Sequence, residues 1–261
     1  QGGYTLTTSV FLNNNRTMPL LGLGLYKATA DDEAENAIAA AVKNGYRLID
    51  TASAYKNEEN VGRGIARCGI PRKDLFITTK IWNNAQRLGD VEGAFQRSLD
   101  RLGLDYIDLY LLHWREDADL AEVAYCMEDL KDRGWIRRWG VSNFDVDDME
   151  DLWKVPDGNK CTVNQVLYNL GTRGIEYDLL DWQREKGVPF MAYSPVGQAG
   201  ALTTQDGVSK SVLMSDPHVK AVADRHGISI VQLLLAFVLR YDDMVAIPKA
   251  VSFDHVEENA Q

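Results

Sequence analysis

Eight short apolar segments alternate with helical patterns from residue 20 onward, and this alternation constrains the fold more than any other feature. Several segments are nearly continuous runs of Val, Ile and Leu, as expected for strands that are covered on both faces. Strands that alternate with helices form parallel sheets, and eight of them in about 250 residues favour a closed (β/α)8 TIM barrel. The expected strands are residues 20–25, 47–50, 75–80, 106–113, 136–142, 162–168, 188–194 and 244–248.

Helical patterns fill the intervening segments. Three of them carry apolar residues at helical spacing and end in glycine, the usual residue after a helix C-terminus. These are Ala34, Ala37, Ile38, Ala41 and Val42; Val91, Phe95, Leu99 and Leu102; and Leu120, Val123, Met127 and Leu130. Further helices are expected at 145–153, 175–186, 217–226 and 229–240. Residues 197–211 lack periodicity and follow the seventh strand, which predicts a loop at the functional face.

The two ends of the chain carry their own signals. Residues 4–6 and 10–12 flank turn-prone residues, and three asparagines at 13–15 are a further turn signal, so we expect an N-terminal β-hairpin. Ser252 is a candidate cap for a last helix, which we expect to be truncated at Gln261. No low-complexity linker divides the chain, so residues 1–261 are expected to form one domain.

Composition excludes several classes of function. The net charge of −10 repels phosphate backbones, which argues against nucleic-acid binding. No run of about 18 apolar residues predicts a membrane span. Cys68, Cys126 and Cys161 form neither a metal-ligand pair nor a disulfide framework, and we interpret them as reduced core thiols of a cytoplasmic, monomeric protein. The four histidines show no metal-ligand spacing, so no metal is expected.

Four ionisable side chains lie at or just after the ends of three successive strands. Asp50 and Tyr55 follow the second strand, Lys80 ends the third and His113 ends the fourth. If the strands are parallel neighbours, the four side chains meet at the end of a barrel where active sites collect. Each residue alone is explained by capping, solvation or packing, but their joint occurrence favours a catalytic site.

These residue types suit the reduction of a carbonyl group. A phenol with a pKa of about 10 is a weak acid near neutrality, and a neighbouring ammonium such as that of Lys80 would lower its pKa and ease proton donation. Asp50 would keep Lys80 charged and oriented. His113 would position the carbonyl oxygen and stabilise its developing negative charge.

Five stretches of the chain resemble the motifs of aldo-keto reductases, in order along the sequence. They are GYRLIDTASAYKNE at 45–58, TTKIW at 78–82, LLHW at 111–114, GVSNF at 140–144 and AIPK at 246–249. The similarity is to the bacterial type that includes diketogluconate reductase and prostaglandin F synthase. The resemblance implies a (β/α)8 barrel that reduces carbonyl compounds with NADPH, with Tyr55 as general acid, Asp50 and Lys80 as its tuning pair and His113 as substrate orienter.

The same resemblance implies a set of cofactor-binding residues. Three would bind the nicotinamide carboxamide, Tyr193 would stack on the ring, the loop after Ser194 would cover the pyrophosphate, and Lys249 would face the 2′-phosphate. The full set is Ser142, Asn143, Gln165, Tyr193, Ser194, Pro195, Val196, Lys249, Ser252, His255, Glu258 and Asn259. Aromatic walls at Tyr26, Trp82 and Trp114 would suit a small apolar or amphipathic carbonyl substrate.

Two positions depart from the family pattern. His255 stands where an Arg commonly clamps the 2′-phosphate, and Ala250 stands where a Ser is usual. A His near neutrality lacks the permanent charge and bidentate geometry of an Arg. We therefore expect NADPH to be the cofactor, with NADH also possible.

Two alternatives to a reductase are open from the sequence. One is a cofactor-binding, redox-sensing regulatory subunit on the same fold, similar to the β subunits of potassium channels. The other is a barrel hydrolase that pairs Asp50 with Asp108. A Rossmann motif is not supported, because Gly22-Leu23-Gly24 lacks the third glycine and no helix follows directly.

Overall fold

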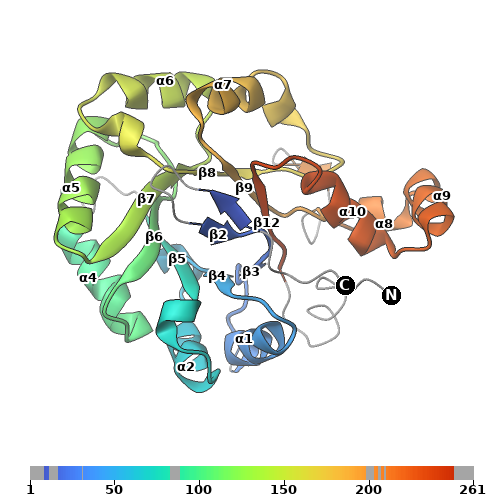
Figure 1. Ribbon diagram of the computed structural model, residues 1–261, viewed down its shortest axis with the longest axis horizontal. Helices are drawn as coiled ribbons and strands as arrows, with labels where there is room; N and C mark the ends of the chain where they lie inside the picture. Colours follow the sequence, from blue (N-terminus) through green and yellow to red (C-terminus); the bar gives the residue numbers. More distant parts are fainter. Residues whose placement is uncertain are drawn as a thin grey trace.

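Eight parallel strands form a barrel that helices surround (Figure 1). The computed structural model describes residues 9–11, 17–30, 32–82, 89–197, 203–204, 207–208 and 210–249. Seven parallel pairings join the strands in the order β3, β4, β5, β6, β7, β8, β9 and β12, which confirms the predicted fold. Their bounds are β3 Gly22–Gly24, β4 Leu48–Asp50, β5 Phe76–Ile81, β6 Ile107–Leu112, β7 Ile136–Ser142, β8 Asn164–Leu167, β9 Phe190–Tyr193 and β12 Met244–Ile247.

The barrel closes between its first and last strands. Ala246 donates its backbone N–H to the carbonyl of Leu20 at 3.0 Å, and Gly24 donates to Pro248 at 2.9 Å. A Cβ at Gly24 would lie 2.9 Å from the carbonyl oxygen of Ile247, so only glycine allows this approach. Gly24, which belongs to the incomplete dinucleotide-binding motif, therefore allows the barrel to close.

The predicted helices that fall within the described residues are present, and two further helices there were not predicted. The helices are α1 Glu33–Lys43, α2 Glu58–Arg67, α4 Val91–Leu102, α5 Leu120–Asp132, α6 Val146–Lys154, α7 Leu179–Lys186, α8 Lys210–Ser215, α9 Pro217–His226 and α10 Ile230–Val238. The segment predicted as one helix at 175–186 divides into the short turn η4 Gly174–Glu176 and α7. The prediction missed α2 and the short α8.

Helix α2 was not predicted because its glycines weaken the helical pattern, and close packing against α4 explains why a glycine is needed there. Its apolar stripe consists of Val61 and Ile65 alone, beside two glycines that weaken a helical pattern. Gly62 lies against α4, where an added Cβ would be 2.4 Å from the carbonyl oxygen of Leu102. The glycine that weakens the helical signal is thus required for contact between the two helices.

The N-terminal hairpin in the described residues joins segments 9–11 and 17–19. β1 Ser9–Phe11 pairs antiparallel with β2 Thr17–Pro19, and the expected strand at 4–6 lies outside the described residues. Figure 1 shows β2 across the middle of the ring of strands. Met18 is fully buried and packs with Leu48, Leu109 and Val245 of the barrel interior, so the hairpin covers one end of the barrel.

The predicted loop after β9 contains regular structure. Two short strands, β10 Thr203–Thr204 and β11 Gly207–Val208, pair antiparallel, and α8 begins at Lys210. The last helix expected after Ser252 lies outside the described residues. Of the three free cysteines, Cys161 is buried in the core, whereas Cys68 and Cys126 are half-buried and pack against it.

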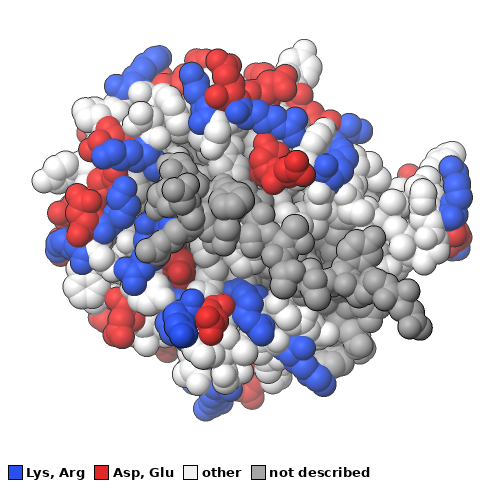
Figure 2. All heavy atoms as spheres, viewed as in Figure 1, with Lys and Arg blue, Asp and Glu red and all other residues white. Residues whose placement is uncertain are grey.

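Charges of both signs are interspersed around the rim of the face in Figure 2, without an extended basic area among the described residues visible there. No single helix in the described ranges is long and apolar enough to cross a membrane. The α9–α10 pair, bent by 90°, passes that test by length and composition only.

Candidate active site

Strand alternation brings the predicted site residues to one end of the barrel. Side chains along a strand point alternately inward and outward. Leu48, Leu109, Val163 and Met191 belong to the core cluster inside the barrel. Counting by twos from them, the inward positions at the carboxyl ends of these strands are those of Asp50, His113, Gln165 and Tyr193. The register adds Lys80, which pairs with the inward Leu111, and Ser142, which pairs with Gln165.

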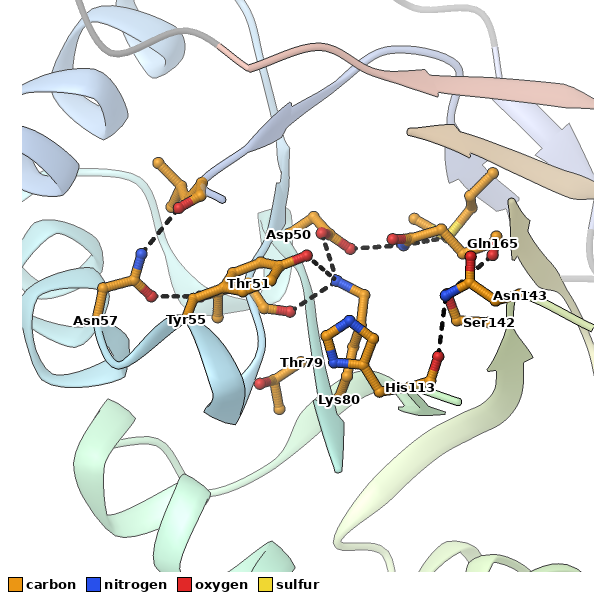
Figure 3. A network of polar contacts seen from close by, with 12 residues as sticks. Asp50, Thr51, Tyr55, Asn57, Thr79, Lys80, His113, Ser142, Asn143 and Gln165 are labelled. Atoms are coloured by element: carbon orange, nitrogen blue, oxygen red, sulfur yellow. Dashed lines mark hydrogen bonds and ion pairs between the residues drawn. The ribbon is translucent and has the colours of Figure 1, made fainter. Parts of the chain in front are cut away.

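Lys80 lies at the centre of a buried hydrogen-bond network (Figure 3). Its ammonium Nζ is 2.7 Å from Asp50 Oδ1, 3.0 Å from the carbonyl oxygen of Thr51 and 3.3 Å from the hydroxyl oxygen of Tyr55. The side chains of Lys80 and Asp50 are 0% and 2% exposed. The structure thus brings together Asp50, Tyr55 and Lys80 as the sequence predicted.

The ion pair keeps Lys80 charged despite its burial. Burial lowers the pKa of Lys80, but the charge of Asp50 and the Tyr55 hydroxyl outweigh it, so the pKa lies above its ordinary value. Burial raises the pKa of Asp50, and Lys80 and Gln165 oppose that effect. Each partner therefore depends on the other to stay ionised in this site.

The acidity of Tyr55 differs from the prediction. Lys80 acts to lower the pKa of Tyr55 as expected, but burial has the larger effect and Asp50 adds to it, so the pKa is raised. Tyr55 therefore stays protonated near neutral pH. The Lys80 ammonium, 4.9 Å from the ring centroid, is placed to stabilise the phenolate that proton transfer would create.

His113 lies beside Tyr55 as a neutral ring. The two ring centroids are 5.8 Å apart, and Trp82 lies edge-on to His113 at 5.2 Å. Burial, with a smaller effect from the charge of Lys80, lowers the pKa of His113 to about 3. Nδ1 is buried and has no hydrogen-bond partner among the described residues. A neutral imidazole with one N–H donor suits the predicted role toward a carbonyl oxygen.

The depressed pKa of His113 predicts an acid-dependent loss of stability. The unfolded chain binds a proton at His113 below about pH 6.5, whereas the folded protein does not until about pH 3. Stability is therefore lost as pH falls from 6.5 toward 3. Between pH 7 and 4.5, wild type should lose about 2 kcal/mol more than His113→Asn, after allowance for the partial exposure of the ring.

Urea unfolding of both proteins at the two pH values measures this difference. A His226→Asn variant provides the control for removal of a histidine outside the site, because His226 is exposed on α9. Equal losses for wild type and His113→Asn would show that His113 is protonated in the folded protein.

The residues predicted to bind the nicotinamide carboxamide present unused hydrogen-bond acceptors. Asn143 donates from Nδ2 to the carbonyl oxygen of His113 at 3.1 Å and accepts from the Tyr193 hydroxyl at 2.6 Å. Ser142 donates its hydroxyl to the carbonyl oxygen of Gln165 at 2.8 Å. Among the described residues nothing donates to Oε1 of Gln165, so this oxygen and the second lone pair of Asn143 Oδ1 remain free. This set fits a carboxamide, whose NH2 group is a donor.

Other predicted cofactor residues lie around the same end. Tyr193 is half-buried, and Pro195 and Val196 after it are buried. Ser194 adopts a left-handed backbone conformation at φ 49°, and its carbonyl accepts from Asn169 and Gly197. The pKa of Lys249 is lowered mainly by burial; the charge of Glu33 opposes this, and that of Lys27 adds a smaller effect.

The predicted substrate residues differ in position. Tyr26 is 55% exposed, with its ring 5.3 Å from that of Tyr55, and Trp114 is 39% exposed after His113. Trp82 also lines a cleft of about 780 Å³, bordered by Ser53, Glu58, Arg97 and Tyr110 on the outer side of the strands. Tyr55 and His113 are not among its described lining residues, so we do not assign the substrate to this cleft.

Two residues that hold the network in place, Asn57 and Glu58, were not predicted from the sequence. Asn57 is buried and accepts from the Thr51 hydroxyl at 2.6 Å, and its Nδ2 donates to the carbonyls of Leu25 and Ala28. It thereby fixes Thr51, whose carbonyl binds Lys80, and the segment that carries Tyr26. Glu58 accepts from Thr79 at 2.8 Å and from Arg101 at 2.8 Å. The Asn-Glu pair that begins α2 within the 45–58 motif was the available signal.

Four predicted cofactor residues, Ser252, His255, Glu258 and Asn259, lie outside the described residues. His218 and His226 are exposed on α9. In the described ranges no three His, Cys, Asp or Glu side chains gather as metal ligands would.

Comparison with known proteins identifies the class. The model of the aldo/keto reductase family matches residues 20–261. A methylglyoxal reductase, YeaE, of Escherichia coli (strain K12) is 41% identical over 253 residues, covering 94% of this chain and 85% of that protein. A glyoxal reductase of Bacillus subtilis (strain 168) is 38% identical, covering 98% and 87%.

Solved structures agree with the sequence matches. An aldo-keto reductase of Klebsiella pneumoniae in complex with NADPH superimposes with a TM-score of 0.86 at 40% identity, covering 97% of this chain and 88% of that chain. This chain belongs to the aldo/keto reductase family. That membership confirms the predicted fold and the predicted class of enzyme, an oxidoreductase that reduces carbonyl groups.

The two alternatives are less well supported. The named relatives are reductases, which does not favour a regulatory subunit. Asp108 cannot pair with Asp50, because it lies one residue before the inward-facing Leu109 and points out of the barrel. There it accepts from the backbone N–H of Ile77 at 2.8 Å and pairs with Arg72 at 2.8 Å.

Proposed function

We propose that the protein reduces small aldehydes and ketones with NADPH, with α-dicarbonyl compounds such as glyoxal and methylglyoxal as the preferred substrates. The observation that carries the proposal is the contact of a protonated Tyr55 with the buried Lys80–Asp50 pair beside a neutral His113. The substrate class is supported by the names of two relatives, a methylglyoxal reductase and a glyoxal reductase.

Each residue of the network has one task in the reaction. His113 donates a hydrogen bond from its neutral ring to the carbonyl oxygen and so orients the substrate. Tyr55 donates its hydroxyl proton to that oxygen as the alcohol forms. Lys80, held by Asp50 and the carbonyl of Thr51, stabilises the resulting phenolate. Tyr26 and Trp82, which flank Tyr55 and His113, would form aromatic walls beside the reacting carbonyl.

The cofactor would be held at both of its ends. Gln165 and Asn143 would accept hydrogen bonds from the carboxamide, Tyr193 would cover the ring and Lys249 would bind the 2′-phosphate. When bound, NADPH supplies the hydride that the carbonyl carbon receives. The Klebsiella pneumoniae relative in complex with NADPH supports this choice of cofactor.

Loss of NADPH absorbance on addition of methylglyoxal tests the proposal. We expect turnover with methylglyoxal and glyoxal, and lower kcat/KM for a bulky aromatic ketone. Tight NADPH binding without turnover of any carbonyl compound would instead support a regulatory, redox-sensing role. No NADPH binding at all would contradict both.

We also expect limited discrimination between the two nicotinamide cofactors. A His at position 255 lacks the permanent charge and planar fork of an Arg, so Lys249 would carry recognition of the 2′-phosphate. The ratio of kcat/KM for NADPH over NADH should lie below a hundredfold. His255→Arg should raise that ratio and Lys249→Met should lower it, both through the value for NADPH. A ratio of a hundredfold or more in wild type would contradict this expectation.

We infer further that residues 1–261 act as a single barrel domain in a cytoplasmic monomer. The family match over residues 20–261 supports one domain, and the free Cys68, Cys126 and Cys161 suit a reducing compartment. Light scattering coupled to gel filtration tests the oligomeric state.

A further inference from the structure

Gln165 links the predicted cofactor site to the catalytic network by a hydrogen bond that the expected roles do not require. Asp50 has two carboxylate oxygens, and both are used. Oδ1 accepts from Lys80 at 2.7 Å, and Oδ2 accepts from Nε2 of Gln165 at 2.8 Å. Asp50 is 2% exposed and Gln165 is 1% exposed, so water does not replace either bond. Figure 3 shows the amide of Gln165 turned toward Asp50.

The charge of Asp50 determines how this amide is oriented. An ionised carboxylate only accepts hydrogen bonds, so the NH2 end of Gln165 must face Asp50 and its oxygen must face away. The backbone of Gln165 is fixed on the other side, because its carbonyl accepts from Ser142 Oγ at 2.8 Å and from the Asn143 N–H at 2.8 Å. The amide oxygen is therefore left as the acceptor of the carboxamide site.

We propose that Gln165 is a positioning residue that couples the carboxamide site to the proton donor, by donating to Asp50 while its oxygen accepts from the cofactor. This inference rests on the proposed function. Gln165 stabilises the charge of Asp50, Asp50 keeps Lys80 charged, and Lys80 prepares Tyr55. In return, Asp50 holds the amide in the one orientation that leaves an acceptor for the carboxamide.

The coupling has a predictable direction. Removal of the Gln165 donor leaves Asp50 with Lys80 as its remaining side-chain donor, so Asp50 holds a proton more strongly. Other titratable groups around the network are Tyr55 from η1 Ser53–Tyr55, Tyr26 after β3, His113 after β6 and Tyr193 of β9. Because Lys80 loses its counter-charge when Asp50 is protonated, the acidic limb of the pH profile of kcat should follow Asp50.

Carboxyl NMR of the protein without cofactor tests the coupling apart from activity. The Asp50 signal is assigned with Asp50→Asn and followed against pH in wild type, Gln165→Met and Ser142→Ala. Met matches Gln in size and lies beside Met191, so the fold should be retained. The Asp50 transition should move up by about one pH unit in Gln165→Met, the loss of one hydrogen bond to a charged group. Ser142→Ala removes one of the two hydrogen bonds to the Gln165 carbonyl but leaves the bond from the Asn143 N–H and the Gln165 amide itself, so it should leave the Asp50 transition in place.

Kinetics provide the second measurement. The acidic limb of kcat at saturating NADPH should move up with the NMR transition in Gln165→Met and stay unchanged in Ser142→Ala, while both variants raise the Kd of NADPH. Gln165→Glu is a second variant that tests the coupling if Gln165→Met does not fold. Its carboxyl should share one proton with Asp50 and produce two transitions, one of them higher than in Gln165→Met.

The two proposals fail in different ways. An Asp50 transition that is identical in wild type, Gln165→Met and Gln165→Glu overturns the coupling, whatever the activity. Absence of carbonyl reduction by wild type overturns the proposed function, and the NMR titration still decides whether Gln165 sets the proton affinity of Asp50.

Discussion

Tyr55→Phe should lower kcat for methylglyoxal by about a thousandfold, within the roughly 10²–10⁴ range of general acid catalysis. The variant keeps the ring that contacts Tyr26 and His113 and removes only the hydroxyl. That hydroxyl makes a single long contact, 3.3 Å, to Lys80 among the described residues. The free energy of unfolding should therefore change by no more than about 1 kcal/mol. Stopped-flow NADPH oxidation and urea unfolding measure the two effects.

A matched variant separates the proton from the ring. Tyr26→Phe also removes a phenol hydroxyl at the mouth of the site, 5.3 Å away between ring centroids, but not the one that contacts Lys80. It should retain kcat within a few-fold of wild type. Similar losses in both variants, or a Tyr55→Phe enzyme with substantial activity, would mean that another group donates the proton.

The eight strands and the catalytic residues could be predicted because both depend on local patterns. Buried parallel strands are short apolar runs, and Asp50, Lys80 and His113 each interrupt or end such a run with an ionisable group. The period of two then places them on the inner side once the strands are parallel neighbours, as β4, β5 and β6 are. Tyr55 was found through its position just after Asp50.

The remaining features depend on contacts between distant segments. The Gln165–Asp50 bond joins residues 115 positions apart, and no local pattern records it. The net acidity of Tyr55 was mispredicted because charge partners are visible in a sequence and the extent of burial is not. The helix α2 was missed for a related reason, since Gly62 is selected by its contact with the backbone of Leu102.

Lys80→Met should abolish most of the turnover while leaving NADPH binding nearly intact. Kcat should fall by on the order of 10³-fold, because both the stabilisation of the phenolate and the position of Tyr55 depend on the ammonium. The Kd of NADPH should rise by at most about tenfold, since Lys80 does not contact the carboxamide acceptors and acts on them only through Asp50 and Gln165. Fluorescence titration with NADPH and steady-state kinetics measure the two quantities. A larger effect on binding than on turnover would make Lys80 mainly a binding residue.

The same substitution should also destabilise the fold, and a second substitution should restore it. Without Lys80, the Asp50 carboxylate is 2% exposed and keeps Gln165 as its only side-chain partner among the described residues. A buried charge without its counter-ion costs up to about 3–5 kcal/mol, and uptake of a proton by Asp50 reduces that cost. Asp50→Asn in the same chain removes that charge, so the double variant should regain most of the lost unfolding free energy but not the turnover. Because the two residues are in direct contact, a double-mutant cycle should show a coupling of about 1–3 kcal/mol. Additive losses of stability would mean that Asp50 and Lys80 are not an ion pair in solution.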